Sequence, residues 1–141
     1  HCWLKSGVLF RKRAVWWYRA ALFMTFLRKL LRFNCLSRYV ISGNSMFPVL
    51  WPADFIVVDK CFYKNRLPKV GEVVLALDPR NHDLVIVKRV SAVYSDGTLE
   101  LLGDNMGEST DSRLFGPISK TLILGRVCIC YWPLSRFGYV R

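Results

Sequence analysis

The stretch DLVIVKRVSAVY, residues 83–94, decides the fold class, because Val and Ile recur through it. Such residues favour strands, in which successive side chains point to opposite faces. The alternation places Lys88 on one face between Ile86 and Val90. An amine between two aliphatic side chains is the unusual feature of this strand. By itself, such a lysine would be an edge-strand residue that discourages aggregation.

Five further runs of similar composition surround this one: RYVIS, DFIVVDK, EVVLALD, TLELLGD and LILGRVCICYW. Turn-forming residues separate them, and SDG at residues 95–97 predicts a hairpin turn, while WPAD, LPKVG and DPRNHD predict loops. A chain of 141 residues allows one domain with a substantial core. We therefore predict a mainly β fold, with an antiparallel β domain over residues 38–141.

Residues 8–33 have a different character, since they lack Pro and Gly and are rich in Ala, Leu, Arg and aromatic residues. They predict a helix within an N-terminal segment, residues 1–37. Its least polar part, residues 14–27, extends for about 21 Å, whereas a transmembrane span needs about 30 Å. Residues 1–53 hold nine Lys or Arg and no Asp or Glu, which favours contact with a membrane surface. A helix packed on the domain is the alternative, and nucleic-acid binding is a third reading that no recognised motif supports.

The five cysteines do not indicate a disulfide framework or a zinc site, because their number is odd and no CxxC pair occurs. We expect reduced thiols. Cys128 and Cys130 would share one face of a strand, which fits core packing better than metal binding. No metal or other cofactor is expected.

A second stretch, SGNSMFPVL at residues 42–50, makes Ser45 either a turn residue or a nucleophile. The two histidines do not suit a Ser-His-Asp triad, because His1 is terminal and His82 is expected in a polar loop. The remaining common way to activate a serine is a lysine whose pKa is lowered by burial. Lys88 has such a setting, so Ser45 and Lys88 are the candidate catalytic pair.

Three motifs occur together: SGNSMFPVL, KRV at residues 88–90, and GDNMGESTDSRLFGPI at residues 103–118. In this order they resemble the serine-lysine motifs of the type I signal peptidase family. The resemblance covers the whole β region of the chain. It implies a catalytic core of the signal peptidase type and serine endopeptidase activity without a cofactor.

The resemblance implies a role for each matching residue. Ser45 matches the serine that attacks the scissile carbonyl, and Lys88 matches the general base that accepts its proton. Ser109 matches a serine whose hydroxyl orients the lysine. Without the resemblance, residues 103–113 would be interpreted as a polar loop rich in turn formers.

Four charged residues match supporting positions of the family. Asp111 and Arg113 match an ion pair that shapes the loop, and we expect them to lie within ion-pair reach. Asp104 matches a partner for the arginine beside the lysine, which is Arg89 in this chain.

The oxyanion hole departs from part of the family. Some members carry a serine two residues before the nucleophile, where this chain has Gly43, and Ser42 is one residue too early. The resemblance therefore implies the backbone N–H of Ser45 as one donor and leaves the second donor unassigned. The loss of one such donor typically costs ~3 kcal/mol of transition-state stabilisation.

Only fourteen residues, 89–102, separate Lys88 from Gly103, so the chain resembles the minimal members of the family. The run over residues 101–127, followed by YWPLSRFG, is most similar to the nickel-type superoxide dismutase maturation proteases. Mitochondrial inner membrane proteases share the FGP and the Trp-Pro-x-x-Arg ending. They usually have a longer segment between the lysine and the GDN motif.

The resemblance implies an endopeptidase that removes an N-terminal propeptide or signal peptide, with nickel superoxide dismutase as the first expected precursor. A general type I signal peptidase or a mitochondrial inner membrane protease subunit is the alternative. A non-enzymatic membrane- or nucleic-acid-binding β module is a distant one. We expect a bacterial protein that is membrane-associated or cytoplasmic, with the mitochondrial inner membrane as the alternative location.

Overall fold

The computed structural model describes residues 35–141, in which eight strands, one short α-helix and two 3-10 helices occur. The strands are β1 (Leu36–Val40), β2 (Phe55–Asp59), β3 (Val73–Asp78), β4 (Asn81–Val93), β5 (Thr98–Leu102), β6 (Ile118–Ser119), β7 (Ile123–Trp132) and β8 (Gly138–Tyr139). The helix α2 spans Ser112–Phe115, and the 3-10 helices η1 and η2 span Lys120–Leu122 and Leu134–Arg136.

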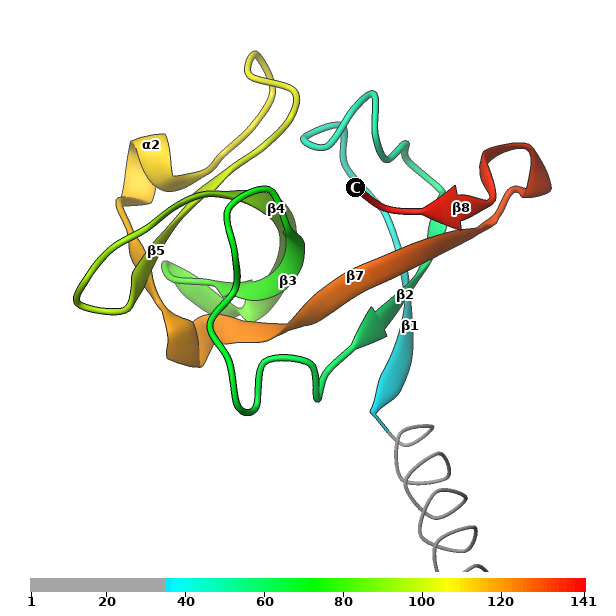
Figure 1. Cartoon of the computed structure of the whole chain (residues 1–141). Helices are drawn as coiled ribbons and strands as arrows, with labels where there is room; N and C mark the ends of the chain where they lie inside the picture. Colours follow the sequence, from blue (N-terminus) through cyan, green and yellow to red (C-terminus); the bar gives the residue numbers. More distant parts are fainter. Residues whose placement is uncertain (1–34) are drawn as a thin grey trace, which may run out of the picture. The chain divides into compact units, whose positions relative to one another are not determined.

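The strands form one sheet in the order β1-β2-β7-β3-β4-β5-β6, with β8 paired to β7, and every pairing is antiparallel. The long strand β7 joins the two halves of the sheet, because its beginning pairs with β3 and its remainder with β2 (Figure 1). The prediction of a mainly antiparallel β domain is confirmed. The short strands β6 and β8 are additions that the sequence did not indicate.

Two boundaries differ from the sequence-based expectation. The predicted DPRNHD loop is wrong in its second half, since β4 begins at Asn81 and places His82 on a strand. The Asp78 carboxylate accepts a hydrogen bond from the Arg80 backbone N–H at 2.9 Å, which closes a short turn and lets the chain pair again at once. The first strand begins at Leu36, slightly before the expected boundary at residue 38.

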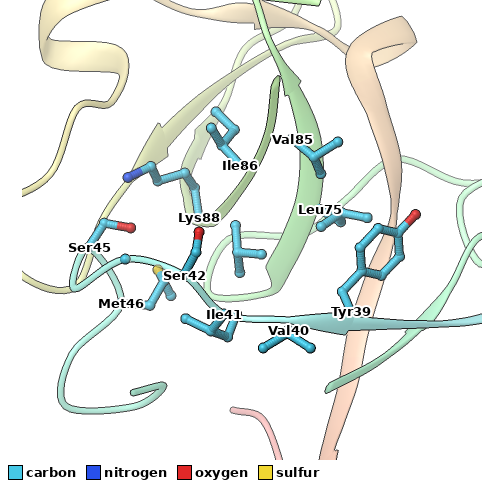
Figure 2. A pocket seen from close by; sticks show the side chains of 12 residues that line it. Tyr39, Val40, Ile41, Ser42, Ser45, Met46, Leu75, Val85, Ile86 and Lys88 are labelled. Atoms are coloured by element: carbon cyan, nitrogen blue, oxygen red, sulfur yellow. The ribbon is translucent and has the colours of Figure 1, made fainter. Parts of the chain in front are cut away.

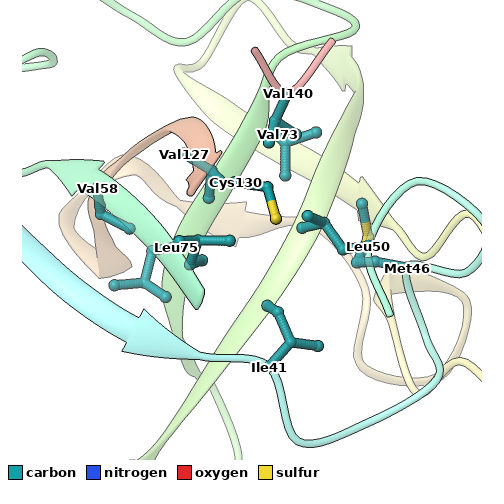
Figure 3. Packing of buried hydrophobic residues seen from close by; sticks show 10 residues of the cluster. Ile41, Met46, Leu50, Val58, Val73, Leu75, Val127, Cys130 and Val140 are labelled. Atoms are coloured by element: carbon teal, nitrogen blue, oxygen red, sulfur yellow. The ribbon is translucent and has the colours of Figure 1, made fainter. Parts of the chain in front are cut away.

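Strand β3 shows how the sheet buries apolar residues on both faces. Its sequence VVLALD is a nearly continuous apolar run, which is typical of a strand covered on both sides. Val73 and Leu75 belong to one buried cluster and Val74 and Ala76 to another, as strand alternation requires. The first cluster, drawn in Figure 3, consists of Ile41, Met46, Leu50, Ile56, Val58, Val73, Leu75, Val127, Cys130 and Val140. The second consists of Tyr63, Val74, Ala76, Val90, Leu99, Leu101 and Ile118.

A disulfide joins Cys35 to Cys61, with a Cα–Cα distance of 5.4 Å. The expectation of reduced thiols is therefore wrong for this pair. The two cysteines meet because β1 and β2 are antiparallel neighbours, with Leu36 opposite Asp59. The Lys60 N–H continues the ladder by donating to the Cys35 carbonyl at 2.9 Å. This contact depends on strand register, which cysteine spacing does not show.

We expect reduction of this disulfide to lower the free energy of unfolding by about 3 kcal/mol, because the bridge closes a chain segment with a sequence separation of 26. Chemical denaturation with and without a reductant measures the difference. The matched control is Cys61→Ser, which should already have the lower stability and should not respond to the reductant. An unchanged midpoint of the wild-type protein in reductant would contradict this expectation.

Two predictions concern residues outside the described range: the helix over residues 8–33 and its contact with a membrane surface. Of the predicted N-terminal segment, residues 1–37, the structure describes only residues 35–37. Among residues 35–141, none of the helices has the length and apolar character needed to span a membrane. The helix α2 is four residues long.

Candidate active site

The loop that carries Ser45 is anchored by buried neighbours. Met46 and Leu50 are 1% and 0% exposed, and the Leu50 N–H donates to the Met46 carbonyl at 2.9 Å. The Ser45 carbonyl accepts a hydrogen bond from the Asn105 N–H at 3.0 Å. Ser45 is therefore held between the core on one side and the GDN motif on the other.

Ser45 and Lys88 line the same pocket, which has a volume of about 250 Å³. In Figure 2 the Lys88 amine extends from β4 toward the end of the pocket where Ser45 lies, and the Ser45 hydroxyl points into the pocket. The remaining walls are mainly aliphatic. The lining residues are Tyr39, Val40, Ile41, Ser42, Gly43, Ser45, Met46, Leu75, Val85, Ile86, Val87 and Lys88.

The Lys88 side chain is buried and has a defined hydrogen-bond partner. Lys88 is 3% exposed, and its Nζ donates to the Ser109 hydroxyl at 2.9 Å. The Ser109 hydroxyl in turn donates to Asp111 Oδ2 at 2.7 Å. Within residues 35–141, no direct hydrogen bond joins Ser45 Oγ to Lys88 Nζ. The structure thus orients the amine from the Ser109 side and leaves its Ser45 side unbonded.

Burial lowers the pKa of the Lys88 amine below its usual value. The negative charge of Asp111 opposes this shift, and the positive charge of Arg113 adds to it. Because the pKa is lowered, a larger fraction of the amine is neutral at a given pH than in a solvated lysine. The neutral amine is the form that can accept a proton.

Asp111 is the centre of a buried hydrogen-bond network behind Lys88. It is 0% exposed, and its Oδ2 accepts hydrogen bonds from the Gly103 N–H at 3.0 Å and from Ser109. Arg113 pairs with both carboxylate oxygens, through Nε at 2.9 Å and Nη2 at 2.7 Å. Burial opposes ionisation of Asp111, but the hydrogen bonds from Arg113, Gly103 and Ser109 hold the pKa of this carboxyl well below its usual range.

Gly103 allows the hydrogen-bond network of Asp111 to pack against the serine loop, residues 42–50. A Cβ at this position would lie 2.0 Å from Ser109 Oγ and 2.6 Å from the Ser45 carbonyl oxygen. Neither distance is possible for a real side chain, and one of the two neighbours is backbone. Position 103, directly after β5, must therefore be glycine, because both Ser109 and the Ser45 carbonyl pack against it.

Arg89 joins β4 to the GDN motif. Its Nε and Nη2 each donate to one oxygen of Asp104 at 2.7 Å, and its Nη1 donates to the Gly71 carbonyl at 2.8 Å. The hydrogen bonds to Asp104 raise the pKa of Arg89 above its already high value, so the guanidinium stays charged. The sequence motif paired these two side chains, and the structure places them in bidentate contact.

A third ion pair, near the loop of residues 42–50, was not predicted from the sequence. Asp54 is 0% exposed, accepts a hydrogen bond from the Trp51 N–H at 2.8 Å, and pairs with Arg136 of η2. The Arg136 guanidinium also lies 4.9 Å from the centre of the Trp51 ring. The two charges are 82 residues apart in sequence, so only the Trp-Pro-x-x-Arg ending gave any signal of the pair.

One pocket of the antiparallel β domain holds a serine and a buried lysine, a combination of groups that fits nucleophilic catalysis by a hydrolase. A family model described as signal peptidase, peptidase S26, matches residues 14–97 and 94–132. The chain belongs to this family and is a serine peptidase of the signal peptidase type.

Several curated relatives have similar sequences over most of their length. Human mitochondrial inner membrane protease subunit 1 is 32% identical over 132 residues, which cover 77% of this chain and 80% of the relative. Mitochondrial ATP-independent inner membrane protease subunit 1a of Arabidopsis thaliana is 30% identical, with coverage of 78% and 84%. Mitochondrial inner membrane protease subunit 2 of Danio rerio is 31% identical, with coverage of 72% and 67%.

Proposed function

We propose that this chain is an endopeptidase in which Ser45 is the nucleophile and Lys88 is the general base. The observation that carries the proposal is that a buried lysine, held by Ser109, lies in the same pocket as a serine of the family motif. Arg89, Asp104, Asp111 and Arg113 act as supports that hold the loop of residues 103–113 in place.

The proposed reaction begins when the neutral Lys88 amine accepts the proton of the Ser45 hydroxyl. Ser45 Oγ then bonds to the scissile carbonyl carbon, and the carbonyl oxygen becomes an oxyanion. Collapse of this intermediate breaks the C–N bond, and the protonated Lys88 gives its proton to the leaving amine. Water hydrolyses the resulting ester by the same route. Throughout the reaction the Ser109 hydroxyl accepts a hydrogen bond from the Lys88 amine. This bond directs the nitrogen lone pair toward Ser45.

The substrate segment would bind in an extended conformation between two strand edges. Within residues 35–141, β1 pairs only with β2, and residues 81–88 of β4 pair only with β3. These unpaired edges flank the pocket, so an extended peptide can pair with their backbone groups. The aliphatic lining of the pocket favours apolar side chains next to the cleaved bond.

The proposed substrate is a precursor whose N-terminal segment is removed at a membrane. The relatives named above are mitochondrial inner membrane protease subunits, which favours this type of processing and association with a second subunit. The Cys35–Cys61 disulfide supports a catalytic domain in an oxidising compartment, where disulfides persist. A nickel superoxide dismutase precursor is a second candidate, supported by the similarity of residues 101–127 and by the short segment between Lys88 and Gly103.

The test is incubation of the purified chain with three groups of precursors, followed by mass spectrometry of the products. The groups are inner-membrane precursors, secretory precursors and the nickel superoxide dismutase precursor. We expect a single cut that removes the N-terminal segment from members of one group. Cleavage that persists in Ser45→Ala, or failure to cut any precursor, would overturn the proposal.

The pH dependence of cleavage provides a separate prediction. Because burial lowers the pKa of Lys88, kcat/KM should rise with pH along a limb whose midpoint lies below the ordinary lysine pKa of about 10.4. Arg113→Ala should move this midpoint to higher pH, since the charge of Arg113 helps to lower the pKa. A pH profile with a peptide that lacks titratable groups measures both. A rate that does not change with pH would contradict a lysine base.

A further inference from the structure

The main-chain geometry of the serine loop explains where Ser42 points. Ile41, the preceding residue, is 7% exposed and belongs to the core. Its N–H donates to the Asp54 carbonyl at 2.9 Å, and its carbonyl accepts from the Ala53 N–H at 2.8 Å. Both backbone groups of Ile41 are therefore fixed, and the direction in which the chain presents Ser42 is fixed with them.

Ser42 lines the same pocket as Ser45 and Lys88. Figure 2 shows its hydroxyl pointing into the pocket, toward the region between Ser45 and the stem of Lys88. The side chain thus reaches the reaction site although it lies three positions before Ser45 in the sequence. The intervening Gly43 and Asn44 are exposed and form a bend between Ser42 and Ser45.

Neither the Ser42 hydroxyl nor the Ser45 backbone N–H has a hydrogen-bond acceptor within residues 35–141. The Lys88 amine, in contrast, is bonded to Ser109. An oxyanion hole needs preorganised donors that are not engaged in the resting protein, since these donors must bond to the oxygen on which charge develops.

We propose that the Ser42 hydroxyl is the second oxyanion donor of this peptidase, acting with the Ser45 backbone N–H. This proposal rests on the function proposed above. Ser42 donates a hydrogen bond to the oxyanion of the tetrahedral intermediate and transfers no proton. Ser42 is then a catalytic residue that supplies, from three positions before the nucleophile, the donor that Gly43 cannot supply.

The test compares the cleavage kinetics of Ser42→Ala with those of the wild-type chain. We expect kcat to fall by ~10²- to 10³-fold with little change in KM, because the hydrogen bond forms only when the oxyanion develops. Ser42→Thr keeps a hydroxyl at an exposed position and should retain most of the activity. Ser42→Cys has a similar shape but a weak donor, and it should resemble Ser42→Ala. Ser95→Ala, at an exposed serine in the turn between β4 and β5 that does not line the pocket, is the matched control and should match the wild type.

Binding of a peptide boronate, whose adduct with Ser45 is tetrahedral, gives a second readout. Its affinity should fall in Ser42→Ala by about the same factor as kcat, while the affinity of the product peptide stays unchanged. Wild-type kcat in Ser42→Ala, together with an inactive Ser45→Ala, would overturn this inference and leave the proposed function intact. An active Ser45→Ala would overturn the proposed function itself.

Discussion

Replacement of either Ser45 or Lys88 by alanine is expected to reduce precursor cleavage by ~10⁴-fold or more. Without Ser45 no ester can form, and without Lys88 none of the described residues that line the pocket has a basic side chain to accept the hydroxyl proton. The double variant should lose little more activity than either single variant, because residues that act as one unit are not additive. Single-turnover cleavage of a precursor, followed by mass spectrometry, measures all three variants.

Further variants separate the loss of chemistry from the loss of fold. Lys88→Arg should also be inactive, because a guanidinium stays protonated and cannot act as the base. Lys88→Met should be inactive but more stable at neutral pH. The reason is that burial disfavours the charged amine in the folded state, which is also why the pKa of Lys88 is lowered, and methionine removes this destabilising effect. The exposed Asn65, in the loop between β2 and β3, is the control site, and Asn65→Ala should keep wild-type activity. Substantial cleavage by Lys88→Ala would rule out the proposed base.

Replacement of Asp111 by alanine is expected to have the largest effect on both stability and activity among the supporting residues. The substitution leaves the buried Gly103 N–H without its acceptor and removes the partner that orients Ser109. We expect the free energy of unfolding to fall by about 3 kcal/mol, as for other buried polar groups that lose a partner. Cleavage should fall as well, since Ser109 would no longer orient Lys88. Chemical denaturation and kcat/KM give the two measurements.

The pH dependence of this loss has a defined sign. The folded protein lowers the pKa of Asp111, so the stabilisation is complete above the ordinary carboxyl pKa of about 4 and disappears as the pH falls further. The difference between wild type and Asp111→Ala should therefore be constant near neutral pH and shrink in acid. Arg113→Ala is the matched comparison. Its guanidinium side chain is 42% exposed, so we expect a smaller loss of unfolding free energy than in Asp111→Ala. Equal losses of unfolding free energy in Asp111→Ala and Arg113→Ala would contradict the prediction that Asp111 contributes more than its partner.

The strands could be predicted because each one depends on nearby residues. The run DLVIVKRVSAVY forms most of β4, and its alternation places Ile86 and Val90 toward the second core cluster with Lys88 between them. The SDG turn was also predicted correctly. In the structure Gly97 has a φ of 83°, and its N–H donates to the Tyr94 carbonyl at 3.0 Å. The motifs likewise named side chains that the structure brings together, such as Lys88 with Ser109 and Arg89 with Asp104.

The contacts that were missed join residues distant in sequence. The Cys35–Cys61 bridge was wrongly expected to be two reduced thiols, because the odd number of cysteines gives no sign of the β1–β2 register. The pair of Asp54 with Arg136 spans 82 residues and depends on the return of the chain along β7 to η2. Ser42 was set aside on spacing alone, which does not show that Ser42 lines the same pocket as Ser45.

The sequence by itself determined the β character of residues 35–141 and the chemical groups of the site, because strand propensity, alternation and side-chain chemistry belong to single residues and their neighbours. The tertiary structure decided which groups meet. The hydrogen bond from Lys88 to Ser109 crosses 21 residues and exists only because the glycine at position 103 lets the loop pack against the Ser45 backbone. The same packing buries Lys88 and lowers its pKa. Burial depends on every element that surrounds the amine, so it is a property of the fold and not of the motif.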